Sequence, residues 1–220
     1  MYPFFLKKIV INKKDHLQNR QVGSHTHYCK FWKEWLFISD LGDNCISQYK
    51  IINDKLVEEC FITFNKNCGP RHFVIKNNKM YLINELDSSI YVLKLDDTNP
   101  NEIKERIKII QELSLLRDKK LKTSTNIHAA EIKLSGDYIY SSNRSENSIS
   151  IYKILANGLL KYINEYSTMG NTPRHFDIKD NMLIVGNQDS NNIVIFEIKN
   201  EKLNYLHKFN SSSPNFINII

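Results

Sequence analysis

Two copies of one four-residue sequence reveal how this chain is organised. Pro70-Arg71-His72-Phe73 returns as Pro173-Arg174-His175-Phe176. In both copies a polar loop follows at the same distance, with Glu85 at 85 − 71 = 14 and Gln188 at 188 − 174 = 14. Two further segments have this offset, one leading from His27 to Leu41 and the other from Ala130 to Arg144. The chain therefore contains four related units.

The spacing of the units indicates their architecture. Successive loop positions are separated by 85 − 41 = 44, 144 − 85 = 59 and 188 − 144 = 44 residues. A period near 44 is typical of β-propeller blades, which have about 40–45 residues each. The longer middle interval indicates an insertion, which we place in the polar stretch 115–127 and interpret as a loop.

Within each unit, four short apolar segments alternate with turns rich in Gly, Asn and Asp, which is the pattern of an antiparallel meander. In the third unit they are 130–134, 138–141, 149–154 and 160–165. We predict an all-β fold, a β-propeller with four-stranded antiparallel blades. The blades are expected at about 25–66, 67–114, 128–168 and 171–210. Residues 1–24 are interpreted as an edge strand or tail, and 214–220 as the first strand of another sheet.

Composition narrows the class of protein. The formal charge is +6 with a pI near 9.0, and much of it comes from lysines scattered through Asn-rich loops, so we expect no nucleic-acid partner. No apolar run approaches the roughly 18 residues of a membrane helix, and no secretory signal is recognised. Cys29, Cys45, Cys60 and Cys68 form no C-x-x-C pair, which favours buried reduced thiols in a cytoplasmic protein.

The repeat predicts a site at one end of the blades. In an up-and-down blade, the loop entering the first strand and the loop joining strands two and three lie on the same face. One mouth should therefore collect two rings of side chains, which are His27, Arg71, Ala130 and Arg174, and Leu41, Glu85, Arg144 and Gln188. Structural positions should resemble one another between blades, as Asn84, Asn143 and Asn187 do. The two rings differ from blade to blade, which indicates a binding site.

Arginines converging with a carboxylate are suited to holding a small anion, because a guanidinium binds phosphate or carboxylate through two parallel hydrogen bonds. The alternative is structural: Arg71 and Arg174 would donate to carbonyls of neighbouring blades while Glu85 pairs with one of them. Two of the histidines, His72 and His175, are interpreted as satisfied core residues. No metal and no cofactor are expected, since the chain has no metal-ligand spacing and no phosphate-binding loop.

Several motifs together resemble the seven-bladed β-propeller lactonase family, which includes bacterial 6-phosphogluconolactonases and fungal carboxymuconate-cyclising enzymes. The likeness covers about residues 19–220. Its motifs are Arg20-Gln21, His25–His27, Asp40–Gly42, Gly69–His72, Asn84–Leu86, Ala130–Ile132, Ser142–Arg144, Pro173-Arg174 and Asn187–Ser190. Relative to this family the chain is short at its N-terminal side, with about four blades and a partial one of an expected seven, so the ring is expected to be open.

The resemblance implies hydrolysis of 6-phosphogluconolactone to 6-phosphogluconate in the pentose phosphate pathway. It also implies a catalytic group, which here is His27, Arg71, Glu85 and Arg144. Arg174, Gln188 and His25 are expected to bind the anionic sugar lactone. Two alternatives remain, a carboxymuconate-type lactone cyclase and a catalytically impaired propeller that acts as a binding module. Self-association through the open blade edges belongs to the same expectation.

Overall fold

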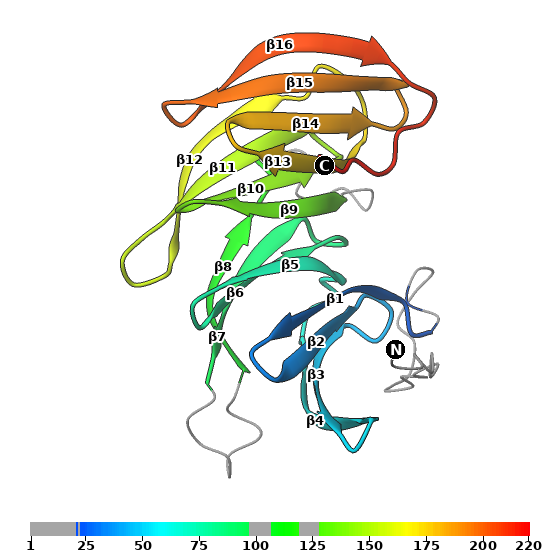
Figure 1. Cartoon of the computed structure of the whole chain (residues 1–220), viewed down its shortest axis with the longest axis vertical. Coiled ribbons are helices and arrows are strands. Elements are labelled where there is room, and N and C mark those ends of the chain that lie inside the picture. The colour runs from blue at the N-terminus through cyan, green and yellow to red at the C-terminus, as the bar shows by residue number, and fades with distance from the viewer. Residues whose placement is uncertain (1–20, 22, 97–106, 119–127) are drawn as a thin grey trace.

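The protein forms four antiparallel sheets of four strands each, stacked face to face in an arc (Figure 1). The computed structural model describes residues 21, 23–96, 107–118 and 128–220. The first two sheets are β1 (Thr26–Trp32), β2 (Trp35–Asp40), β3 (Cys45–Ile52) and β4 (Lys55–Thr63), then β5 (Pro70–Lys76), β6 (Lys79–Asn84), β7 (Ser89–Leu95) and β8 (Ile107–Ser114).

The remaining two sheets repeat this plan. They are β9 (Ala129–Ser135), β10 (Tyr138–Asn143), β11 (Ser148–Ile154) and β12 (Leu160–Ser167), then β13 (Pro173–Lys179), β14 (Met182–Asn187), β15 (Asn192–Lys199) and β16 (Lys202–Asn210). In each sheet the strands pair in sequence order, as in a propeller blade. The predicted all-β fold of four-stranded blades is confirmed, and the ring is not closed.

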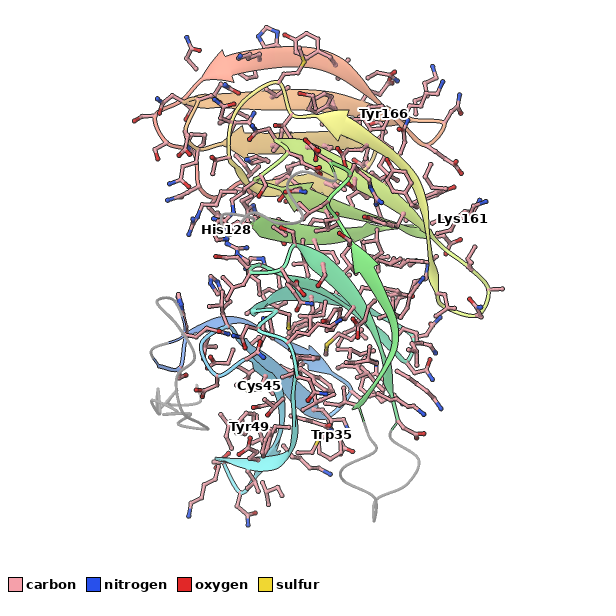
Figure 2. The ribbon with its side chains drawn as sticks, turned by 180° about the vertical axis from the view of Figure 1, so that it is seen from behind. Trp35, Cys45, Tyr49, His128, Lys161 and Tyr166 are labelled. Carbon is pink, nitrogen blue, oxygen red and sulfur yellow. The ribbon has the colours of Figure 1, made fainter. Side chains whose placement is uncertain are left out.

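Alternating side chains hold neighbouring blades together. On β6, Met80 and Leu82 pack toward the first sheet, whereas Tyr81 and Ile83 pack toward the third. Successive side chains of a strand point to opposite faces, so a blade with neighbours on both sides is apolar on both faces. A third cluster, which includes Phe176 and Val185, joins the third and fourth sheets. Figure 2 shows side chains between neighbouring sheets along the whole stack.

The inner strand of each blade lines the centre of the arc. β1 contacts β5, β5 contacts β9, and β9 contacts β13. Each inner strand carries a register shift near its start, and in three blades it falls at one residue: His27 between Thr26 and Tyr28, and the arginines of the two repeated sequences. In β9 the shift covers residues 130 and 131. A β-bulge of this kind adds one residue to a strand and re-aims its side chains.

The loops after the second strands share one conformation, although their sequences differ. Each has four residues between its flanking strands, and the last of the four has a positive φ: Asn44 (51°), Ser88 (47°), Asn147 (53°) and Asn191 (54°). Asn tolerates this left-handed region better than most residues. The first residues of these loops are the second ring of positions identified from the repeat.

A common hydrogen bond fixes the 14-residue offset in space. The backbone N–H of each loop's first residue donates to the carbonyl two residues before the bulge position. The pairs are Leu41 to His25 (3.0 Å), Glu85 to Gly69 (2.7 Å), Arg144 to His128 (2.8 Å) and Gln188 to Thr172 (2.9 Å). The two rings of positions therefore meet at one end of all four blades.

Two expectations outside the four blades have different outcomes. No strand forms over 214–220, because the amides of Ile217 and Ile219 donate to side chains of β13 rather than to a strand backbone. Their acceptors are Nδ1 of His175 (3.2 Å) and Oδ2 of Asp177 (2.9 Å). Most of the segment 1–24 lies outside the described residues, as do residues 119–127 of the expected insertion loop.

All four cysteines are free, but only three are buried, because Cys29 is exposed on β1. The expectation that all the thiols are buried is therefore wrong for this one. Cys29 pairs with Ile38 across the first sheet, on the face turned away from the second sheet, where none of the described blades packs against it. Within the described residues, no helix is long and apolar enough to cross a membrane.

Candidate active site

Glu85 is the centre of a buried charge cluster at the end of the blades where the two rings of positions meet. Its Oε2 lies 2.8 Å from Nε of Arg71, and its Oε1 lies 3.1 Å from Nη2 of Arg144. Nε2 of His27 is 4.0 Å from Oε2 of the same carboxylate. The side chains of Glu85 and Arg71 are only 1% and 5% exposed. The structure thus brings together the four residues that the sequence singled out, and their catalytic role stays a prediction.

Both arginines also donate to backbone carbonyls of β9, Arg71 from the preceding blade and Arg144 from within the same blade. Nη1 of Arg71 donates to the carbonyl of Ala130 (2.5 Å), and Nη2 of Arg144 donates to that of Ala129 (3.1 Å). Arg71 therefore makes both contacts of the structural alternative, to a neighbouring carbonyl and to Glu85, while its role in binding a ligand stays a prediction. These anchors fix the direction of each guanidinium. A site whose donors are held in place in advance stabilises developing charge without reorganising.

Burial and neighbouring cations change the acid–base properties of the cluster. Burial, together with the smaller effect of the adjacent Arg71, lowers the pKa of His27 to about 3, so this imidazole is neutral at pH 7. Burial also lowers the pKa of Arg71, with smaller contributions from the like charges of Arg144 and Arg174. An arginine remains protonated despite such a shift. The mouth therefore holds several fixed cations beside a neutral imidazole, which favours an anionic ligand.

The three residues expected to bind substrate lie around this cluster. Arg174 is half-buried at the bulge of β13, and with other described residues it makes no ion pair, so its charge is available to a ligand. His25 is exposed, and its ring centroid is 4.7 Å from that of His27. Gln188 begins the loop after β14, and its side chain makes no hydrogen bond to another described residue. Their contact with substrate is still a prediction.

A second cluster, formed by His72, Glu131 and His175, lies next to the first and was not predicted from the sequence. Nδ1 of His72 is 2.8 Å from Oε2 of Glu131, and Nε2 of His175 is 2.9 Å from the same oxygen. All three line a cavity of about 640 Å³, which also reaches His27 and Arg71. Burial would raise the pKa of Glu131, but the hydrogen bonds from His175 and His72 outweigh it and lower that pKa. Glu131 is therefore ionised.

The repeat held a signal for this second cluster. His72, Glu131 and His175 each follow the first-ring position of their blade, so they form a third ring. The two histidines are satisfied, as expected, but they lie on a cavity wall rather than in the core. Among the described residues, no group of three His, Cys, Asp or Glu side chains is placed to hold a metal ion. The two ring nitrogens aim at one carboxylate oxygen, which is a hydrogen-bonding arrangement.

The four-stranded blades define a propeller-type protein, and comparison with known families shows which family it belongs to. The family described as "Lactonase, 7-bladed beta-propeller" matches residues 6–218. The chain belongs to this lactonase family.

Individual relatives agree with this assignment. A 6-phosphogluconolactonase of Formosa agariphila is 34% identical over 196 residues, covering 82% of this chain and 52% of that protein. One of Bacillus subtilis is 30% identical over 185 residues, covering 81% and 51%. A crystal structure of a Lactobacillus plantarum protein has a TM-score of 0.80 at 27% identity, covering 90% of this chain and 59% of that one.

The chain spans about half the length of the curated relatives it matches.

Proposed function

We propose that this protein hydrolyses a small anionic sugar lactone, 6-phosphogluconolactone, to 6-phosphogluconate, a step of the pentose phosphate pathway in the cytoplasm. The observation that carries the proposal is the carboxylate of Glu85 held between the guanidinium groups of Arg71 and Arg144. This unit lies beside Arg174, whose charge is not neutralised by a described carboxylate. The names of relatives at 30–34% identity supply the substrate class.

Each group has a distinct role in this proposal. Arg71 and Arg144 stabilise the negative charge that develops on the carbonyl oxygen when water attacks the lactone. Arg174 binds the phosphate. Glu85 orients the guanidinium groups of the two arginines. Because both of its oxygens are paired with these groups, it is a poor base. His27, neutral at pH 7, orients the water. Preorganised donors of this kind contribute about 10²–10³-fold each.

The test is the rate of lactone opening above the spontaneous rate. Purified protein is added to freshly made 6-phosphogluconolactone, and product is measured over time at several protein concentrations. The proposal predicts an excess rate proportional to protein concentration, which Arg144→Ala abolishes. The same assay with a carboxymuconate lactone decides between the hydrolase and the cyclase. If neither substrate reacts faster than in buffer at any protein concentration, the enzyme proposal is wrong.

A second candidate function, a binding module, rests on the two end sheets. The face of the first sheet turned away from the second carries three aromatic or branched side chains that are about half exposed: Phe31 (54%), Ile51 (52%) and Phe61 (53%). The outward face of the fourth sheet carries Met182 (38%) and Phe209 (48%). A propeller normally covers such faces with another blade. In this proposal a second copy of the chain covers them.

Size-exclusion chromatography at several concentrations tests this association. Self-association through these faces predicts a dimer or larger species that dissociates on dilution, and Phe31→Glu with Phe61→Glu should give monomers. A single monomer peak for the unmodified protein at every concentration contradicts it. An active monomer favours the enzyme, whereas an inactive oligomer favours the binding module.

A further inference from the structure

Neither Glu85 nor His27 is a good acceptor for the proton of the attacking water. Both oxygens of Glu85 are occupied by guanidinium groups, at 2.8 and 3.1 Å. The pKa of His27 is lowered to about 3 by burial, so its imidazole is a weak base. A group that transfers protons efficiently has a pKa closer to the working pH. The reaction therefore needs another base within the same cavity.

His72 has the position for this task. It is the residue after Arg71, and the bulge at Arg71 turns both side chains toward the cavity of about 640 Å³. Its ring centroid is 6.1 Å from that of His27, and Nη1 of Arg71 lies 3.4 Å from its Nε2. The imidazole of His72 is 16% exposed, so water can reach it.

Glu131 and His175 fix the proton positions of this imidazole. The backbone N–H of Ile217 donates to Nδ1 of His175, so the proton of a neutral His175 is on Nε2, which donates to Glu131. The ionised carboxylate of Glu131 is an acceptor only, so Nδ1 of His72 must also carry a proton and donate to it. The remaining nitrogen of His72, Nε2, then carries the lone pair, and its one recorded contact within the described residues is the long one of 3.4 Å to Nη1 of Arg71.

We propose that Nε2 of His72 accepts the proton of the attacking water, and that Glu131 acts as the positioning residue that holds His72 in the Nδ1–H tautomer. A carboxylate behind an imidazole, on the side away from the reacting atoms, orients it and stabilises the imidazolium that forms. Burial lowers the pKa of His72, whereas the hydrogen bond to Glu131 acts in the opposite direction. The ring is thus neutral before the reaction.

The step balances without another reactant. The water oxygen forms a bond to the carbonyl carbon of the lactone while one of its protons moves to Nε2 of His72. The carbonyl electron pair moves onto oxygen, where Arg71 and Arg144 face it. When this pair returns, the bond between the carbonyl carbon and the ring oxygen breaks. The proton on Nε2 passes to that oxygen, which leaves a hydroxyl group and a carboxylic acid that ionises.

Several ionisable or aromatic groups surround His72 and would influence its titration. They come from β1, β5, β9 and β13, and they are His27, Tyr28, Arg71, Glu131 and His175. The positive charge of Arg71 opposes protonation of His72, and the carboxylate of Glu131 supports it. Replacing Glu131 should therefore make His72 a weaker base, and its proton should no longer be confined to Nδ1.

The first experiment does not depend on activity. The full chain is labelled with ¹⁵N-histidine, and the nitrogen shifts of His72 are assigned from the signal that disappears in His72→Gln. At pH 7.5 the proposal predicts a neutral ring with the proton on Nδ1, and Glu131→Gln should produce a mixture of tautomers. A ring with its proton on Nε2, or an imidazolium, would overturn the assignment. Adding 6-phosphogluconate should shift the Nε2 signal.

The second experiment measures kcat and KM for 6-phosphogluconolactone, and it rests on the proposed function. His72→Gln should lower kcat by about 10²–10⁴-fold with little change in KM, as expected for loss of a general base. Glu131→Gln should lower kcat less and shift the acidic limb of the pH profile, and Glu131→Asp should restore part of the rate. His207→Gln, a histidine on the outer strand β16, is the control and should match the unmodified protein.

The two failures are distinguishable. If the unmodified protein shows no excess hydrolysis, the proposed function fails, and the nitrogen spectrum still decides whether His72 has the predicted tautomer. If the protein is active and folded His72→Gln keeps its kcat, the role of His72 is wrong while the proposed function stands. Thermal melting of each variant identifies loss of folding. If His72→Gln does not fold, Glu131→Gln tests the role of His72 instead: an unchanged kcat and pH profile in this variant would show that the proposed role is wrong.

Discussion

Nε of Arg71 lies 2.8 Å from Oε2 of Glu85, with both side chains almost completely withdrawn from solvent. The pair joins the first strand of a blade to the loop that follows its second strand. A buried carboxylate or guanidinium is tolerated only when its partner is in place, because desolvation of a single charge is expensive. This relationship gives Glu85 a structural role in addition to the functional one proposed for it.

Replacing Glu85 by Gln should therefore affect stability and activity together. The change leaves the charges of Arg71 and Arg144 buried without a carboxylate, and breaking a buried pair in this way costs about 3–5 kcal/mol. Urea unfolding should report this loss, and any excess lactone hydrolysis should disappear. Glu112→Gln is the matched control, since Glu112 pairs with Lys66 at the surface and is 45% exposed. Equal stability of the two variants would contradict the structural role of Glu85.

Arg174→Gln should distinguish a phosphorylated from an unphosphorylated substrate. If this arginine binds the phosphate, its loss removes a hydrogen bond between charged groups, worth about 1.5–3 kcal/mol, and raises KM by roughly 10–100-fold. For unphosphorylated gluconolactone the KM should not change. Steady-state kinetics with both lactones provide the measurement. The same increase in KM for both substrates would show that Arg174 does not contact the phosphate.

The stability of the protein should rise with pH between about 3 and 6.5. The pKa of His27 is near 3 in the folded protein and 6.5 as a free side chain, so only the unfolded chain binds this proton within that interval. Stability from this group is complete above pH 6.5 and is lost on acidification. His27→Gln should reduce the slope by up to ~1.4 kcal/mol per pH unit in unfolding titrations. An unchanged slope would mean that His27 titrates normally.

Thiol labelling should separate Cys29 from the other cysteines. Cys29 is exposed, whereas Cys45, Cys60 and Cys68 are buried, and burial raises the pKa of Cys68 well above its usual value. A thiol-reactive dye should therefore label one cysteine quickly in the folded protein and all four after unfolding in urea. Cys29→Ser should abolish the fast phase. Fast labelling of that variant would show that a buried cysteine becomes accessible.

The blades and the charge cluster around Glu85 could be predicted from the sequence, because a repeat places equivalent residues at equivalent points of each blade. Once Arg71 and Glu85 were known to occupy fixed points of a blade, the equivalent points of other blades located His27 and Arg144. The 14-residue offset corresponds to one hydrogen bond in each blade, such as that from the N–H of Glu85 to the carbonyl of Gly69. Patterns of this kind are visible in sequence because each blade must satisfy the same backbone.

The cluster of His72, Glu131 and His175 could not be predicted from the sequence, and the reason is again physical. A lone histidine in a predicted strand is more often a satisfied core residue, so the sequence places His72 in the core, whereas along a regular strand it would point to the face opposite Arg71. The bulge brings both toward the cavity, and bulges depend on hydrogen bonding across the strand pair rather than on residue type. Glu131 was missed because it occupies the position that the repeated sequences fill with histidine. The tail 214–220 was predicted as a strand from its apolar residues, which do not specify a partner.

The bulge in every inner strand has a consequence for how such a protein can change its chemistry. The extra residue is not paired across the strand, so the backbone ladder on either side stays intact when its side chain is replaced. At this equivalent position one blade carries a histidine, His27, and two carry arginines, Arg71 and Arg174. Substitutions at the bulge position can thus change ligand specificity blade by blade, while the backbone pairing of the strands is retained.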